Sequence, residues 1–185
     1  AGNVYNSLLS VVNSTASVKA VKVRFLEGKN SREVLDFNLF LSPKDVWTAG
    51  IVPMGVSVSG TPAPGAGIIT ADKSCTLPPI PEGGKAFVSF AYSGDGAGST
   101  LDRTKEGYVE IIEMGDVTGP TAVGVTHVAG VPPCTGLANS VAATNTVLGS
   151  GGLFGGMTII NVNASAETSI DAVALDAFRL TTPIW

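Results

Sequence analysis

Two runs of alternating apolar and polar residues, joined by a short turn, constrain the fold of this chain more than any other feature. Apolar side chains occupy every second position from Val21 to Phe25 and again from Leu35 to Leu41. A period of two places these side chains on one face of a β-strand. The intervening segment, Glu27 to Ser31, contains a glycine and an asparagine, which adopt positive φ readily and favour a hairpin. The segment is therefore predicted to form two antiparallel strands with one buried face.

The rest of the chain continues as short strand candidates separated by turns. Further strands are predicted at 7–13, 46–52, 55–59, 68–71, 86–92, 107–114, 117–131 and 157–162. Residues 107–114 have apolar side chains on both faces, which is typical of a central strand. The chain contains 23 glycines and 11 prolines, and turn signals recur about every 8–12 residues. The prediction is an all-β fold, an antiparallel immunoglobulin-like sandwich with long loops, in a single domain spanning 1–185.

One or two short helices are expected within this β framework. A helix is predicted at 135–146. A second is predicted at 169–180, where apolar residues follow helical spacing behind a Thr168 or Ser169 cap. A strand ending near Phe178 is the alternative for the second segment.

The charge content excludes several classes of function. Charged residues are 14% of the chain, the net charge is −4, and no basic cluster occurs, which argues against nucleic-acid binding. No apolar run approaches the roughly 18 residues of a membrane span.

The candidate catalytic and metal-binding residues fit poorly with an enzyme. His127 is the only histidine and lies in an apolar, strand-like setting without a nucleophile elbow elsewhere. Glu110 and Glu113 would point to opposite faces of a strand, so the acidic stretch around them is interpreted as solvent-facing charge. Asp95 and Asp102 flank a glycine-rich loop that lacks the residue order of a calcium site. We expect no enzymatic activity, no metal and no cofactor.

The two cysteines indicate the compartment. Cys75 and Cys134 both lie beside prolines in turn-like segments, and an even count in such positions favours a disulfide. Two buried free thiols are the alternative. A disulfide, together with a low lysine content, favours a secreted or cell-surface location.

Several motifs carry a resemblance to a known family. The segments 10–15 and 19–49, the latter reading KAVKVRFLEGKNSREVLDFNLFLSPKDVWTA, resemble a family of secreted or surface proteins of Gram-negative bacteria that are mostly uncharacterised. The likeness continues more thinly through 106–115, 126–134 and 151–155. It implies export by a signal peptide and a mostly β fold, and it supplies no catalytic motif. Members of the family are longer, which implies that this chain is a fragment of a longer secreted protein.

These observations together predict a non-catalytic extracellular structural or interaction protein. One form of it would be a self-assembling subunit of a surface layer or filament. The strand from Val18 to Leu26 is expected at a sheet edge, where it could pair with another copy. A second segment has neither charge nor proline and is predicted to pair within its own sheet or with a neighbouring subunit; its residues are Ser7, Leu8, Leu9, Ser10, Val11 and Val12. Pairing between subunits would make a homo-oligomer or filament.

A carbohydrate-binding module or adhesin domain with a glycan partner is the alternative function. Such a module needs aromatic side chains on an exposed face. The candidates are Tyr5, Trp47, Tyr92, Tyr108 and Trp185, of which Trp47 is expected in the core.

Overall fold

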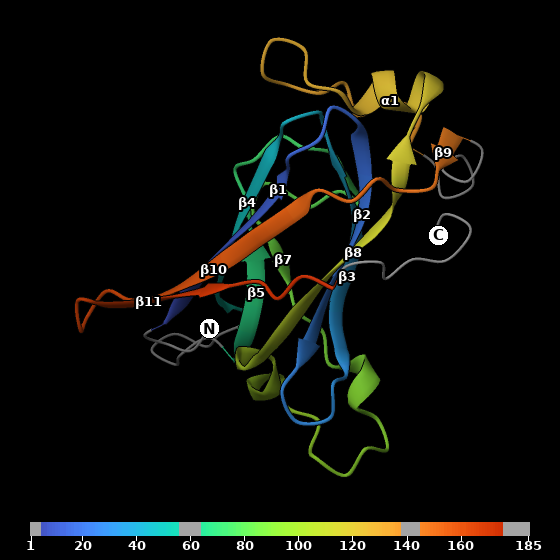
Figure 1. Cartoon of the computed structure of the whole chain (residues 1–185). Coiled ribbons are helices and arrows are strands. Elements are labelled where there is room, and N and C mark those ends of the chain that lie inside the picture. Colours follow the sequence, from blue (N-terminus) through green and yellow to red (C-terminus); the bar gives the residue numbers. More distant parts are fainter. Residues whose placement is uncertain (1–4, 56–63, 138–144, 176–185) are drawn as a thin grey trace.

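The computed structural model describes residues 5–55, 64–137 and 145–175, which form two antiparallel β-sheets (Figure 1). The larger one, sheet A, has the strand order β11 (Ala166–Asp171), β10 (Leu153–Asn161), β1 (Asn6–Asn13), β4 (Val46–Met54), β5 (Gly65–Ile69), β7 (Lys85–Ala86). The smaller one, sheet B, has the order β6 (Thr76–Leu77), β3 (Glu33–Leu41), β2 (Val18–Glu27), β8 (Gly107–Val117), β9 (Thr146–Val147). The predicted all-β antiparallel sandwich is confirmed.

The β2–β3 hairpin forms the centre of sheet B, as the alternating pattern predicts. Val23 lies opposite Phe37, and the two strands remain in register from Lys19 to Phe25. The other side of β2 pairs with β8 along its whole length. The expectation that Val18 to Leu26 lies at a sheet edge is therefore wrong, because both sides of this strand are occupied.

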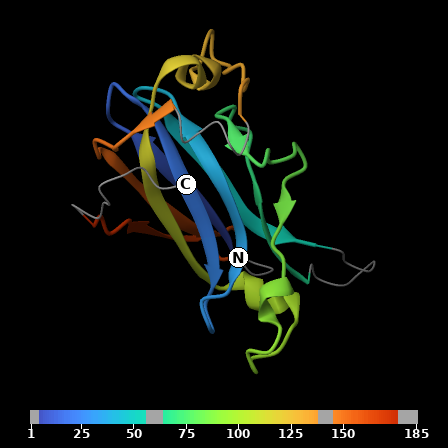
Figure 2. The ribbon, with the colours of Figure 1, turned by 90° about the vertical axis from the view of Figure 1, so that its right-hand side faces the viewer.

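The main core lies between the two sheets, and in Figure 2 sheet B lies in front of sheet A. Alternate residues of the long strands point inward and exclude water, which provides most of the stabilisation in such a fold. Trp47, Val23 and Leu39 are completely buried. The rings of Phe37 and Trp47 pack with centroids 5.8 Å apart.

A second, smaller core lies on the outside of sheet B. Helix α1 (Gly119–Val125) covers the end of this sheet, and Val125 packs there with Phe40, Met114 and Cys75. This helix replaces the strand predicted at 117–131. β8 ends at Val117 because Gly119 adopts φ +58° and a proline at the first turn starts a helix.

Two other predicted elements differ from the structure. In the segment predicted at 86–92, only Ala86 is strand, as the last residue of β7, and the end of the segment forms the 3-10 helix η1 (Phe90–Tyr92). Residues 169–171 belong to β11, which pairs with β10, so the predicted helix at 169–180 is wrong there. The remainder of that prediction beyond 175, most of the helix at 135–146 and most of the strand at 55–59 lie outside the described residues.

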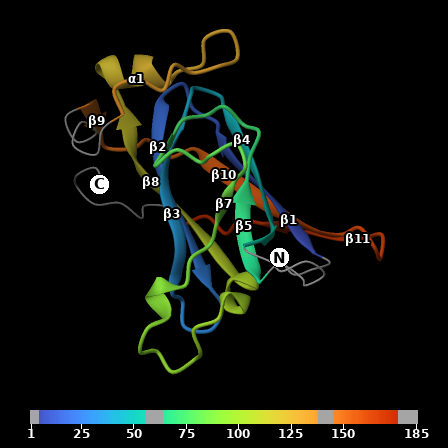
Figure 3. The same ribbon diagram turned by 180° about the vertical axis from the view of Figure 1, so that it is seen from behind.

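The edge strands of the two sheets differ in how much of their length is paired. β9 pairs with β8 only at Asp116 and Val117, so in the described part of the chain most of β8 is an edge strand rather than the predicted central one. In sheet A the β10–β11 hairpin projects beyond the rest of the sandwich, as Figures 1 and 3 show from opposite sides. All six residues of β11 are exposed.

Candidate functional site

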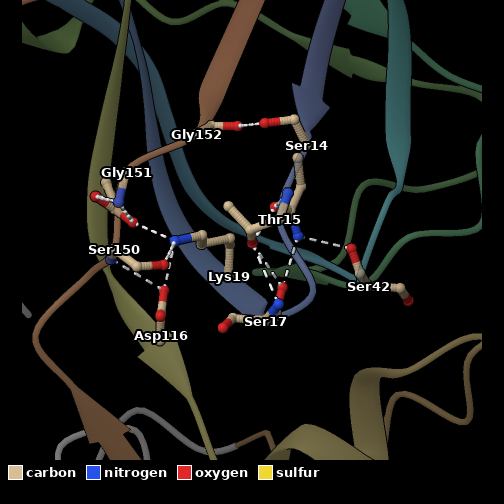
Figure 4. A network of polar contacts seen from close by, with 11 residues as sticks. Ser14, Thr15, Ser17, Lys19, Ser42, Asp116, Ser150, Gly151 and Gly152 are labelled. Atoms are coloured by element: carbon tan, nitrogen blue, oxygen red, sulfur yellow. Dashed lines mark hydrogen bonds and ion pairs between the residues drawn. The ribbon is translucent and has the colours of Figure 1, made fainter.

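A lysine with two carboxylates lies inside one end of the sandwich (Figure 4). Lys19 occupies the face of β2 that carries Val21, and its side chain has no exposed surface. Its Nζ lies 2.6 Å from Glu113 Oε1, 2.5 Å from Asp116 Oδ1 and 2.8 Å from Ser150 Oγ. Each ammonium hydrogen therefore has an oxygen acceptor, as a buried cation requires. We call these four residues the Lys19 cluster.

A β-bulge in β8 brings the two carboxylates of the Lys19 cluster together. Residues three apart on a regular strand point to opposite faces. Here Val21 lies opposite Glu113 whereas Ala20 lies opposite Gly115, so one extra residue is inserted. Glu113 and Asp116 consequently share the face of Lys19.

The loop before β10 completes the Lys19 cluster. The backbone N–H of Gly151 donates to both oxygens of Glu113 at 3.1 Å, and that of Ser150 donates to Asp116 at 3.4 Å. Burial raises the pKa of Asp116, but hydrogen bonds from Lys19 and Ser150 outweigh this and leave the pKa below its ordinary value.

The structure corrects the interpretation of the acidic stretch. Glu110 points to the outer face and pairs with Arg24 at 2.8 Å, as expected for a surface charge. Glu113 and Asp116 are instead turned inward to Lys19. Sequence reasoning overlooked one signal: Lys19 falls in the same alternation as Val21 and the other apolar residues of the strand, which indicates a buried position.

A second ionic cluster is buried at the opposite end of β2. The Arg103 guanidinium donates to Glu27 at 2.9 Å and to Asp95 at 2.7 Å, and it lies 3.9 Å from the centre of the Tyr92 ring. Burial raises the pKa of Glu27, but hydrogen bonds from Arg103 and from backbone N–H groups lower it to about 2. Arg103 likewise holds the pKa of Asp95 far below its usual range. This cluster joins the β2–β3 turn to the loops that carry η1 and η2 (Leu101–Lys105).

The two aspartates that flank the glycine-rich loop considered as a calcium site are both engaged in ion pairs. Both oxygens of Asp95 are hydrogen-bonded to Arg103, and Asp102 pairs with Lys105 at 2.8 Å. Within the described ranges, no group of three or more His, Cys, Asp or Glu side chains is placed to hold a metal ion.

His127 follows α1 rather than lying in a strand. Its Nδ1 is 2.7 Å from Ser42 Oγ and 3.4 Å from Asp45 Oδ2. A catalytic Ser-His-Asp triad places the serine and the acid on opposite ring nitrogens, so this arrangement lacks the required geometry. Ser42 also accepts the backbone N–H of His127 at 2.9 Å. The contacts attach the end of α1 to the β3–β4 turn.

The two cysteines are bridged, which confirms that prediction. The sulfur atoms of Cys75 and Cys134 are 2.06 Å apart and the Cα atoms 5.5 Å apart. Cys75 belongs to the smaller core, so the bond attaches the segment after α1 to the outside of sheet B.

The outer faces of the two sheets differ in charge. Four adjacent strands of sheet A, β10, β1, β4 and β5, contain no Asp, Glu, Lys or Arg. On the outer face of sheet B, Lys22 pairs with Asp36, and Arg24 pairs with Glu33 and Glu110. The four strands β10, β1, β4 and β5 thus present a charge-free face, whereas sheet B presents a charged one.

The charge-free face is hollowed. A depression of about 960 Å³ crosses β10, β1, β4 and β5. Leu8, Ile69 and Phe154 line it and are 48%, 39% and 60% exposed. Two carboxylates from outside these four strands, Glu82 and Asp171, also line it. We call this depression the sheet A hollow.

The predicted assembly strand lies in the middle of sheet A. Residues Ser7 to Val12 pair with β10 on one side and with β4 on the other. This segment is predicted to pair either within its own sheet or with a neighbouring subunit, and in the structure it pairs within its own sheet. Leu9 and Val11 enter the core, whereas Leu8 lies in the sheet A hollow.

Among the described residues, none of the aromatic candidates for glycan binding lines the sheet A hollow. Trp47 is buried as expected, and so is Tyr92. Tyr5 and Tyr108 are exposed, but neither lines the sheet A hollow. Trp185 lies outside the described residues.

Comparison of the chain with protein-family models, with curated proteins and with solved structures finds no match. In the part of the chain that the structure describes, no helix has the length and apolar character needed to cross a membrane.

Proposed function

We propose that this protein is a non-catalytic, extracellular structural protein whose copies associate through the charge-free face of sheet A. The observation that carries the proposal is the absence of charged residues from four adjacent strands of sheet A. Burying a charged group costs free energy unless it is paired, whereas burying an apolar group is favourable and a hydroxyl group needs only a hydrogen-bond partner. A large uncharged, hollowed face is therefore suited to contact with protein.

A second copy of this chain is the proposed occupant of the sheet A hollow. The turn of the β10–β11 hairpin, Val162 to Ser165, is uncharged, and Val162 is 72% exposed at its tip. β11 buries none of its residues, and a hairpin with so little packing is marginally stable alone. Seating the tip in the hollow of the next copy would bury apolar surface on both sides.

Such a contact is head-to-tail. Because the tip and the hollow are different surfaces of one chain, each copy can bind one neighbour with each. Contacts of this type continue into open filaments unless the rotation closes a ring. The Cys75–Cys134 disulfide supports an extracellular site of action, since such bonds persist in oxidising compartments. Carbohydrate binding has less support, because among the described residues Phe154 is the one aromatic side chain lining the hollow.

The experiment introduces a charge into each surface separately. Leu8→Arg alters the hollow, Val162→Arg alters the tip, and Val123→Arg is the control on α1, where the side chain is 73% exposed. We expect light scattering and sedimentation to show association of the wild type. The first two variants should associate about tenfold more weakly or worse, a loss of at least about 1.4 kcal/mol, and the control should match the wild type.

Mixing the two defective variants tests the head-to-tail arrangement. Each retains one intact surface, so the mixture should form dimers of one copy of each and no larger species. A wild type that stays monomeric at high concentration would refute self-association. Loss of association in the Leu8→Arg variant alone would refute the hairpin tip as the occupant.

A further inference from the structure

The Lys19 cluster brings an amine nucleophile and a carboxyl group together in a buried site. Lys19 and Asp116 lie directly opposite each other on β2 and β8. We propose that an amide bond forms between Nζ of Lys19 and Cγ of Asp116, and that Glu113 carries the protons for this reaction. The inference is independent of the proposed self-association, because the cluster lies inside the chain and the reaction needs no second copy.

Proximity is the first argument for the cross-link. Nζ lies 2.5 Å from Asp116 Oδ1, so the nitrogen is already close to the carboxyl carbon to which that oxygen is bound. Holding two reacting groups in this way can be equivalent to a concentration of about 10⁵–10⁸ M. The Lys19 side chain has no exposed surface, and its three partners fix the position of its nitrogen.

The reaction balances without an added reagent. In the starting ion pair the ammonium carries three hydrogens and Asp116 is a carboxylate. Glu113, 2.6 Å from Nζ, takes one proton, and rotation about the Cε–Nζ bond turns the free electron pair toward Cγ. Glu113 passes this proton to an oxygen of Asp116, so that a neutral amine faces an uncharged carboxyl group. The N–C bond forms, a second proton moves from nitrogen to the same oxygen, and that C–O bond breaks with release of one water molecule. The nitrogen keeps its third hydrogen as the amide N–H, and Glu113 is again a carboxylate.

The surroundings favour the product over the ion pair. Two buried charges, whose desolvation is costly, are replaced by one neutral amide and a released water molecule. The backbone N–H of Ser150 points at Asp116 Oδ1 and can stabilise the negative oxygen of the tetrahedral intermediate. Glu113 remains fixed by Gly151 throughout.

Intact-mass spectrometry of the reduced, denatured wild-type protein tests the proposal. We expect a mass lower than that of the sequence by one water molecule. Proteolysis should release the peptide containing Lys19 joined to the peptide containing Asp116, and tandem spectra should place the bond between these two residues. A folded wild type with the full sequence mass would overturn the proposal.

Two variants assign the roles within the cluster. Asp116→Ala removes the acceptor, and Glu113→Gln keeps both reacting groups but removes the proton carrier. Both should show the full mass expected for their sequences, with circular dichroism used to verify folding. A cross-link retained in the Glu113→Gln variant would overturn the role of Glu113. The wild-type measurement decides the existence of the bond even if neither variant folds.

The chain supplies a matched control pair in the same sheet. Lys22 and Asp36 also form an ion pair between adjacent strands, but their side chains are 31% and 40% exposed. This pair is open to water, and in the described part of the chain no second carboxylate is bonded to Lys22 Nζ. The peptides containing Lys22 and Asp36 should therefore be recovered separately. A joined pair there would show that burial and Glu113 are not what drives the reaction, and would contradict the proposal.

Discussion

Among single residues, Glu27 has the ionisation on which the fold depends most clearly. Its side chain has no exposed surface and accepts hydrogen bonds from Arg103 and from the backbone of the β2–β3 turn. Its pKa in the folded protein is lowered from 4.5 to about 2. A carboxylate with a lowered folded pKa stabilises the protein above its unfolded pKa, and this contribution is lost as the pH falls through the folded value.

The expected result is a free energy of unfolding that decreases as the pH is lowered from about 4.5 towards 2. Asp95 contributes in the same direction, since Arg103 lowers its pKa as well. Urea unfolding at a series of pH values measures how steeply the free energy of unfolding depends on pH. The Glu27→Gln variant, which cannot ionise at this position, should be less stable at neutral pH and show a shallower slope. An identical slope in this variant would contradict the assignment.

At the scale of elements, the attachment of β10 to β1 requires a glycine. A Cβ atom on Gly155 would lie 2.3 Å from the backbone oxygen of Ser10, and backbone in the centre of a sheet cannot move aside without breaking its pairing. Gly155→Ala should therefore separate the two strands locally and cost about 1–3 kcal/mol of unfolding free energy. Chemical denaturation of the purified variant measures this loss.

Gly83→Ala is the control for that substitution. A Cβ atom there would meet no atom within 4 Å, so the unfolding free energy should change by less than about 0.5 kcal/mol. Equal stability of the two variants would mean that β10 can shift away from β1 without loss, and that the close approach is not required.

At the scale of the whole molecule, the disulfide connects parts of the chain that the sheets leave separate. Cys75 and Cys134 are 59 residues apart, and closing this loop restricts the unfolded chain. Reduction should lower the free energy of unfolding by about 2–4 kcal/mol. The main core should remain folded, because the bond lies outside the sandwich, in the smaller core under α1.

Urea unfolding with and without reductant measures this effect. The double variant Cys75→Ala, Cys134→Ala should have the same free energy of unfolding as the reduced wild type, apart from the small loss of packing by the two sulfur atoms. Maleimide labelling of the denatured, unreduced protein should find no free thiol. Two labelled cysteines per chain would contradict the bridge.

The sequence by itself determined the features that depend on local periodicity. The alternation from Val21 to Phe25 and from Leu35 to Leu41 specified the β2–β3 hairpin and its inward face, since only one phase buries the apolar side chains. The turn composition specified an antiparallel sandwich. The prolines beside Cys75 and Cys134 located both cysteines outside strand interiors, where a disulfide could form.

Only the tertiary structure decided which strands are central and which charges are buried. Whether Val18 to Leu26 lies at an edge depends on β8, which joins it from about ninety residues along the chain. The segment predicted as a helix at 169–180 has helical spacing, yet pairing with β10 makes residues 169–171 a strand. The Lys19 cluster depends on a bulge and on a loop 131 residues away. Contacts over such separations leave no periodic trace in the sequence, because each partner satisfies its own local pattern whether or not the other is near.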